Sequence, residues 1–312
     1  MLKPPWFAPA ARRSADAKEW ENAMELGRAF QKIHVEFDAP AKSLWVCFAS
    51  DGVPSYTVAV LEDLHALCAI VKQRFQAAAL SGARAPVRFF ILASRMPGVF
   101  NMGGDLGLIA TLSRSRDRSA LEHYARLTAD IVHMMWSGVD LPMVTISAVD
   151  GNAFGGGFEA ALSTQFMVAA PTAKFAFPEV RFGLFPGMGA TSLLGRRTTK
   201  AFAERMIVEG NTISGGEAFA EGICDRLAKR GTAVDLVRRL TRRWSSDDRF
   251  AAVFRLAASR QAAARYDRTE ARAVVAVWVD AVLGLDERRI KHIDKIVGAQ
   301  RLMGARLAER QA

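Results

Sequence analysis

Short apolar runs that alternate with amphipathic stretches are the main pattern along this chain. Almost continuous apolar runs, typical of buried strands, occur at residues 43–50, 87–94, 142–149 and 165–170. Between them, apolar residues recur three or four positions apart, which predicts amphipathic helices over residues 61–75 and 119–136. Strands that alternate with helices in this way predict an α/β fold class.

The pattern divides the chain into three parts. Residues 1–38 mix prolines with the stretch DAKEWENAMELGRAF, which predicts an irregular arm and a short helix. Residues 39–231 are expected to form the α/β core with the active site. Strand signals disappear over residues 232–312, so a helical C-terminal region is expected there; the family resemblance given below implies that this region covers an acyl pocket and makes oligomer contacts. Inside the core, Ser214 and Glu217 form a predicted capping box.

The composition is that of a globular protein in a reducing compartment. The chain has 312 residues, of which 50% are hydrophobic. No apolar run approaches the ~18 residues that span a bilayer, and the N-terminus does not resemble a signal peptide. The cysteines number 3 and lie far apart, which does not indicate a disulfide framework. A cytoplasmic protein without a membrane partner is expected.

The charge balance favours acidic partners without identifying one. The formal net charge is +10, from 42 basic and 32 acidic side chains. The sequence has no zinc-finger spacing, no RNP-like motif and no basic stripe interleaved with aromatic residues, so a nucleic-acid partner is not expected. The basic clusters at residues 238–244 and 286–295 resemble solvated helix faces. An acidic carrier protein is the alternative partner.

Several kinds of chemistry lack their sequence signals. The histidines show no HExxH pair and the cysteines no CxxC, so no metal site is expected. There is no GxSxG elbow for a serine hydrolase and no Walker A motif. The glycine stretches lack the GxGxxG fingerprint of dinucleotide sites. No cofactor is therefore expected.

Three segments remain as candidates for chemistry. They are FNMGGDL (residues 100–106), GNAFGGGFEAALS (151–163) and FAFPEVRFGLFPGMGAT (175–191). The first two follow predicted strands, and the second opens a predicted helix. Glycines at a helix N-terminus expose unpaired backbone N–H groups to a close ligand, in a positive local dipole. Each segment alone is also compatible with an ordinary structural turn.

Together, the three segments resemble the signatures of the crotonase (enoyl-CoA hydratase/isomerase) superfamily, in the same order and spacing. The stretch SGGEAFAEGICDRL is similar to the segment that ends the core there, and the resemblance covers residues 43–285. It implies a crotonase-like ββα spiral core. The NMGGDL loop, the N-terminal arm and the helical tail look most like the bacterial diffusible signal factor synthases. Those enzymes make cis-2-unsaturated fatty acids for quorum sensing.

The resemblance also implies an oxyanion hole for a thioester carbonyl. Residue by residue, its N–H donors map to Met102 and Gly156, with Gly103 and Gly155 beside the substrate. An enolate oxygen needs such donors aimed in advance at about 2.7–3.1 Å. A glycine N–H lets the thioester approach without a Cβ in the way.

Glu159 and Glu179 are the predicted acid–base pair. Elimination of water from a 3-hydroxyacyl thioester needs one group to take the α-proton and another to protonate the departing hydroxyl. Two carboxyls that face one small volume can hold opposite protonation states. The plain structural alternatives are a surface acid for Glu179 and a first-turn helix acid for Glu159.

The resemblance to the signal synthases implies that this protein is a bifunctional dehydratase and thioesterase. It would convert a 3-hydroxyacyl-acyl carrier protein to a cis-2-enoyl thioester and then to the free acid. Two alternatives stay open: an enoyl-CoA hydratase of fatty-acid catabolism, and a crotonase-fold regulatory protein. The same resemblance implies a homotrimer or hexamer and allows a quorum-sensing sensor kinase as a partner. The sequence does not decide between carrier-bound and CoA-bound substrates.

Two large side chains are predicted to wall an acyl pocket. Met188 lies between glycines in FPGMGAT, and Trp278 lies in ARAVVAVWVDAVLGL, the most apolar stretch of the C-terminal helices. A long alkyl chain needs a dry, mostly apolar pocket beside the carboxyls. The alternative is that both are plain core residues.

Overall fold

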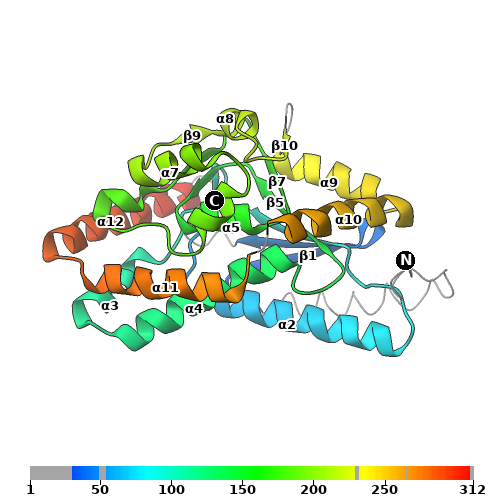
Figure 1. The fold of residues 1–312 in the computed structure, drawn as a ribbon, viewed down its shortest axis with the longest axis horizontal. Helices are drawn as coiled ribbons and strands as arrows, with labels where there is room; N and C mark the ends of the chain where they lie inside the picture. Colours follow the sequence, from blue (N-terminus) through cyan, green and yellow to red (C-terminus); the bar gives the residue numbers. More distant parts are fainter. Residues whose placement is uncertain (1–29, 49–53, 229–231, 265, 310–312) are drawn as a thin grey trace.

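The computed structural model describes residues 30–48, 54–228, 232–264 and 266–309, which Figure 1 shows as a ribbon. The expected helix within DAKEWENAMELGRAF lies outside the described residues. No helix within these ranges is both long and apolar enough to cross a membrane.

A six-stranded, mostly parallel sheet forms the centre of the molecule. Its spatial order is β1-β2-β3-β5-β7-β10, and only the β1–β2 pair is antiparallel. The strands are β1 (Ile33–Asp38), β2 (Ser43–Phe48), β3 (Phe89–Ser94), β5 (Val144–Val149), β7 (Phe166–Ala169) and β10 (Arg226–Leu227). Every residue of β5 and β7 is buried, as expected for parallel strands covered on both faces. The expected α/β class is confirmed, and so are the four predicted strands.

Residues 33–38 differ from the prediction for residues 1–38. They were expected to belong to an arm with a helix, but Ile33–Asp38 form strand β1 at the edge of the sheet. Apolar Val35 and Phe37 alternate there with polar His34 and Glu36, and residues 34–37 are all partly buried, as suits a strand at the edge of the sheet.

A second, four-stranded sheet carries the short turns of the site. Its order is β4-β6-β8-β9, from β4 (Val99–Asn101), β6 (Asn152–Phe154), β8 (Lys174–Ala176) and β9 (Ile213–Ser214). In sequence, β4 follows β3, β6 follows β5 and β8 follows β7. These three main strands each pass through a turn into a short strand, and the residues after the short strands come together at one place. Two or three residues are too few to give a periodic sequence signal.

Helices cover both faces of the main sheet (Figure 1). Leu44 and Val46 of β2 face a cluster that includes α2 (Val58–Leu80) and α4 (Arg118–Ser137). Trp45 points to the other face, under α9 (Ala233–Trp244) and α10 (Asp247–Ala263). This alternation is the period-two geometry of a strand.

The shorter helices lie between these elements. They are η2 (Ala39–Ala41), α3 (Leu106–Ser115), α5 (Gly156–Ser163), η3 (Pro178–Phe182), α6 (Ala190–Gly195), α7 (Lys200–Glu209) and α8 (Gly215–Ala220). The predicted capping box at the start of α8 is confirmed. Glu217 N–H donates to Ser214 Oγ, and Ser214 N–H donates to the Glu217 carboxylate.

The described residues from 232 onward are helical apart from their connections, as expected. The last two helices, α11 (Arg268–Leu283) and α12 (Glu287–Glu309), return to the first half of the chain. α11 packs along α4, and α12 packs along α3. Ser113 Oγ donates to the Val282 carbonyl at 2.8 Å, and Arg118 pairs with Asp280 at 2.5 Å.

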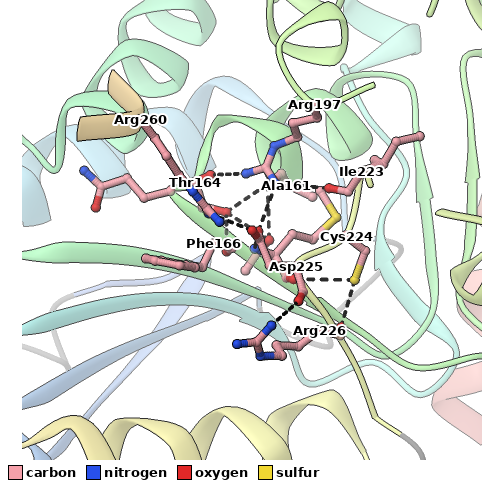
Figure 2. A network of polar contacts seen from close by, with 12 residues as sticks. Ala161, Thr164, Phe166, Arg197, Ile223, Cys224, Asp225, Arg226 and Arg260 are labelled. Carbon is pink, nitrogen blue, oxygen red and sulfur yellow. Dashed lines mark hydrogen bonds and ion pairs between the residues drawn. The ribbon is translucent and has the colours of Figure 1, made fainter. Parts of the chain in front are cut away.

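A polar network fastens the end of the core, within the predicted closing segment (Figure 2). The Asp225 carboxylate lies between Arg197 at 3.0 Å and Arg260 at 2.7 Å, and it accepts the Met167 N–H. Arg197 also donates to the Thr164 carbonyl. Burial opposes ionisation, but the pKa of Asp225 is lowered because Arg197 and the Met167 N–H outweigh that effect. The network joins β7 to α10 and to the segment after α6.

Candidate active site

A cavity of about 390 Å³ lies where the turns of the second sheet meet the C-terminal helices. All of the predicted site residues except Gly103 line it: Met102, Gly155, Gly156, Glu159, Glu179, Met188 and Trp278. Gly103 lies directly behind, where a Cβ would come 2.9 Å from the Gly156 nitrogen. Segments far apart in sequence therefore meet at one place.

Glu159 is held in the first turn of α5 by its neighbours in space. The residue is 1% exposed, and its Oε1 accepts the N–H groups of Met188 at 2.7 Å and Ala190 at 2.9 Å. Burial raises the pKa of Glu159 to about 7, although the N–H groups of residues 188–190 act in the opposite direction. The carboxyl is not the solvated first-turn acid of the plain structural alternative.

Glu179 is held differently, in η3 directly after Pro178. The residue as a whole is half-buried, but its Oε2 is wholly buried and has no hydrogen-bond partner among the described residues. Burial, and to a smaller extent the neighbouring Glu159 carboxyl, raises the pKa of Glu179 to about 8. A backbone hydrogen bond from Glu179 itself acts in the opposite direction, but burial outweighs it and favours the neutral form.

The glycines of the opening segment are explained by what lies against them. Gly155 has φ +52°, and a Cβ there would lie 2.3 Å from Glu179 Oε1. At Gly157, a Cβ would lie 2.1 Å from the Asn101 carbonyl oxygen, so no side chain fits between α5 and β4. The triplet lets the backbone of α5 approach both Glu179 and the neighbouring turn.

The predicted N–H donor Met102 is not available. Its N–H donates to the Pro54 carbonyl at 2.8 Å, which corrects the expectation from sequence. The Gly103 N–H is also used, by the Asn101 side-chain oxygen at 2.8 Å. Gly104 lines the cavity, and its nitrogen lies 3.4 Å from where a Gly156 Cβ would be. Within the described residues, the N–H groups of Gly104 and Gly156 have no protein acceptor.

Gly104 is thus the residue that sequence reasoning missed. It belongs to the same quoted loop, FNMGGDL, but the loop contains neighbouring N–H groups of similar sequence context. Only the Pro54 and Asn101 contacts decide which N–H stays free. Tyr124 was also missed: its hydroxyl accepts the Asp105 N–H at 2.8 Å and so fixes the residue after Gly104.

The predicted pocket walls Met188 and Trp278 both lie at the cavity. They are 7% and 8% exposed. The Met188 sulfur sits over α5, 2.6 Å from where a Gly156 Cβ would be. Other apolar side chains complete the wall, including Leu106, Ile109, Leu184 and Ile296. The arrangement places an apolar volume beside two carboxyls.

The basic cluster at residues 238–244 is not a free cationic surface near this cavity. Arg238 pairs with Glu36 at 3.1 Å and lies over the Trp45 ring at 4.3 Å. Arg242 pairs with Asp38. These residues lie on α9, on the face of the main sheet opposite α2 and α4. The cluster is therefore a poor candidate for docking a carrier at the site.

A mixed α/β fold with buried carboxyls beside unpaired N–H groups defines a protein of the crotonase class. The model of the family Enoyl-CoA hydratase/isomerase matches residues 61–280. The chain belongs to the enoyl-CoA hydratase/isomerase family.

Curated relatives and solved structures agree with this assignment. The chain is 35% identical over 157 residues to methylglutaconyl-CoA hydratase 1 of Pyricularia oryzae, covering 50% of this chain and 43% of that protein. It is 33% identical over 149 residues to the human methylglutaconyl-CoA hydratase, covering 48% and 42%. The chain thus spans about half the length of these relatives, 43% and 42%.

Among solved structures, the enoyl-CoA hydratase of Bacillus halodurans superposes with a TM-score of 0.67 at 17% identity, covering 84% of this chain and 98% of that one. The enoyl-CoA hydratase of Bacillus anthracis gives a TM-score of 0.63 at 20% identity, covering 87% and 98%. At these identities the likeness concerns the fold.

Proposed function

We propose that this protein is an enoyl-CoA hydratase, which adds water reversibly across the C2=C3 bond of an acyl thioester. The observation that carries the proposal is the pair of buried carboxyls, Glu159 and Glu179, facing one apolar cavity next to the free N–H groups of Gly104 and Gly156. The named relatives are CoA hydratases, which favours CoA thioesters as substrates.

The two carboxyls have distinct parts in this reaction. The N–H groups of Met188 and Ala190 favour the ionised form of Glu159, which takes a proton from water as the water oxygen bonds to C3. The electron pair of the C2=C3 bond moves toward the thioester carbonyl. Glu179, protonated by its burial, gives its proton to C2 as the carbonyl re-forms.

The free N–H groups stabilise the charge that appears between these steps. The enolate oxygen would accept the N–H groups of Gly104 and Gly156, whose geometry is fixed by the Pro54, Asn101 and Glu179 contacts around them. Donors fixed in advance need no reorganisation when the charge develops. In the reverse direction the same groups eliminate water from a 3-hydroxyacyl thioester.

The dehydratase–thioesterase reaction is our second proposal. The apolar cavity walls suit a long alkyl tail, and the same carboxyls could activate water for attack on the thioester carbon. This second proposal includes an acyl carrier protein and a sensor kinase as partners. The trimer or hexamer comes from the family resemblance, and the cytoplasmic location comes from the composition. All of these remain predictions.

One experiment separates these possibilities. The purified protein is incubated with trans-2-enoyl-CoA thioesters and, separately, with 3-hydroxydodecanoyl-acyl carrier protein, and products are identified by mass spectrometry. Reversible hydration of the CoA thioester without free acid supports the first proposal. Free cis-2-enoic acid from the carrier-bound substrate supports the second. Absence of turnover with both substrates contradicts both and favours a regulatory role.

A further inference from the structure

The segment Gly187–Ala190 controls the surroundings of Glu159. Two of its N–H groups, from Met188 and Ala190, donate to Glu159 Oε1 at 2.7 and 2.9 Å. Hydrogen bonds from N–H groups to an ionised carboxylate are strong and favour the charged form. Whatever fixes this segment therefore also fixes the state of Glu159.

Trp278 of α11 packs against the first residue of the segment. A Cβ on Gly187 would lie 2.3 Å from Trp278 Cδ1 and 2.4 Å from Cγ. Gly187 is absent from the glycines with positive φ, so its backbone conformation is open to any residue. Glycine is needed at this position because the indole ring occupies the space of a side chain.

Tyr266, just before α11, packs against the other end. Its hydroxyl lies 2.6 Å from where a Gly189 Cβ would be and donates to the Met188 carbonyl at 3.5 Å. The Tyr266 ring is 3% exposed and packs edge-on against Trp136, with Arg196 over its face at 5.7 Å. Its position is thus fixed from several sides.

The beginning of α11 is also joined to α6, which follows the segment directly. Arg196 pairs with Glu270 at 3.0 Å, and Ser192 Oγ donates to the same carboxylate. The helix that carries Trp278 is thereby held to the helix that begins at Ala190.

We propose that Trp278 and Tyr266 are positioning residues, which hold residues 187–189 so that the N–H groups of Met188 and Ala190 stay on Glu159. Neither side chain touches the Glu159 carboxyl through a hydrogen bond; each acts through the segment between them. The inference gives the C-terminal region a part in the chemistry beyond walling the cavity. It rests on the proposed function only for its kinetic consequence.

The groups that share the cavity with Glu159 could also change its titration. They are Glu179 and Arg181 from η3, Tyr124 from α4 and His292 from α12. Tyr266, before α11, does not line the cavity but interacts electrostatically with Glu159. β4 and β6 contribute no titratable side chain. A test must therefore move the segment without removing any of these groups or opening the cavity to water.

Gly187→Ala meets this requirement, because its methyl group collides with the Trp278 ring and displaces the segment. Infrared spectroscopy follows the titration of the Glu159 carboxyl, which is assigned by subtracting the spectrum of Glu159→Gln. We expect the midpoint to rise by ~1 pH unit as the two N–H groups move away. The acidic limb of kcat/KM should rise with it.

Three further variants make the comparison specific. Gly195→Ala in α6 is the matched control, because a Cβ there meets nothing within 4 Å, and its midpoint should not move. Trp278→Leu removes the ring against which the segment packs, so its midpoint should rise as well. Tyr266→Leu removes a hydroxyl whose pKa is raised by burial, so no charge is lost, and the midpoint should rise even if Gly187→Ala does not fold.

The outcomes separate this proposal from the proposed function. An unchanged midpoint in folded Gly187→Ala, or in folded Trp278→Leu, overturns the role of Trp278. An unchanged midpoint in Tyr266→Leu overturns the role of Tyr266. Because the infrared titration uses no substrate, a wild-type protein without hydratase turnover would refute the function and leave the positioning result intact.

Discussion

The start of α5 and the short helix η3 each place one glutamate at the same cavity, and they treat it in opposite ways. In α5, the Glu159 carboxyl reaches across to the next segment and accepts two N–H groups. In η3, Glu179 Oε2 has no partner among the described residues, and Oε1 lies against the backbone of Gly155. Identical side chains thereby differ in pKa, with more backbone donors on Glu159 and the added effect of the Glu159 charge on Glu179.

The contrast also explains why neither glutamate could be moved to the other position. The donors of Glu159 belong to a segment that the C-terminal region fixes, whereas the environment of Glu179 is dominated by burial and leaves Oε2 without a partner among the described residues. An acid–base pair built this way needs no third charged group beside it. The role of each glutamate can be tested by changing that glutamate or its surroundings while the other is left unchanged.

The largest effect is expected from replacing either carboxyl. Glu159→Gln and Glu179→Gln should each fold and lose ~10²–10⁴ in hydration rate, the range typical of a positioned acid or base. Steady-state kinetics with an enoyl-CoA thioester measures the loss. The double variant should be little worse than the single ones, since both act in one event. Near wild-type turnover in one variant would remove that glutamate from the pair.

A smaller loss is expected from crowding Glu179 through Gly155. In Gly155→Ala, the methyl group meets the Glu179 carboxyl and the positive φ adds backbone strain, so we expect a ~10–10²-fold loss of kcat and a lower melting temperature. The matched control is Gly98→Ala. Gly98 also has positive φ, at +72°, but a Cβ there meets nothing within 4 Å. If both variants lose only stability and keep kcat, the contact with Glu179 does not matter for the chemistry.

The raised pKa values also predict a change of stability with pH. A carboxyl whose pKa is higher in the folded than in the unfolded protein stabilises the fold below the unfolded value, and that stability is lost as pH rises through the folded value. The stability that Glu159 and Glu179 allow therefore falls as the pH rises from about 4.5 to 8, and the loss is complete above that range. Glu179→Gln should be more stable than wild type at pH 9 by on the order of 2 kcal/mol, and similar at pH 5.

Urea unfolding at the two pH values measures this difference. Glu217→Gln is a suitable control, since the pKa of the exposed Glu217 is lowered by its capping contacts and should give no gain at pH 9. An equal stability of wild type and Glu179→Gln at pH 9 would mean that Glu179 is not buried in its charged form.

The smallest effect concerns the apolar wall that both glutamates face. Trp278→Ala should shift the preference among acyl-chain lengths, with ~0.8 kcal/mol for each methylene group that gains or loses burial. Competition between enoyl-CoA thioesters of different length measures the shift, and Ile296→Ala on the opposite wall is the comparison. A folded Trp278→Ala enzyme with an unchanged length profile would show that Trp278 does not contact the acyl chain.

Much of the fold could be predicted from the sequence because its strands and helices are long and periodic. The runs at residues 87–94 and 142–149 become β3 and β5, and the helices of residues 61–75 and 119–136 extend into α2 and α4. The short strands β4, β6, β8 and β9 could not be predicted, because two or three residues carry no period. The segment around β1 lacked a continuous apolar run, since it lies at the sheet edge.

For the site, the sequence identified the loops that form the cavity, but it did not identify every backbone N–H group that is free there. Glu159, Glu179, Met188 and Trp278 all reach the cavity as expected, although their roles remain to be tested. The sequence suggested Met102 as the N–H donor, but the free N–H belongs to Gly104. The Met102 N–H is occupied by Pro54, and a contact between residues about fifty positions apart leaves no local sequence signal. Likewise, no local pattern shows that Gly187 is a glycine because of Trp278, or that Tyr266 lies against Met188.

The return of α11 and α12 to the cavity has a consequence for the order of events during synthesis. Glu159 and Glu179 leave the ribosome about a hundred residues before Trp278 and Ile296, which line the cavity. A nascent chain can therefore form most of the sheet before the cavity walls on α11 and α12 exist. The surroundings of both carboxyls are complete only when these last helices have docked.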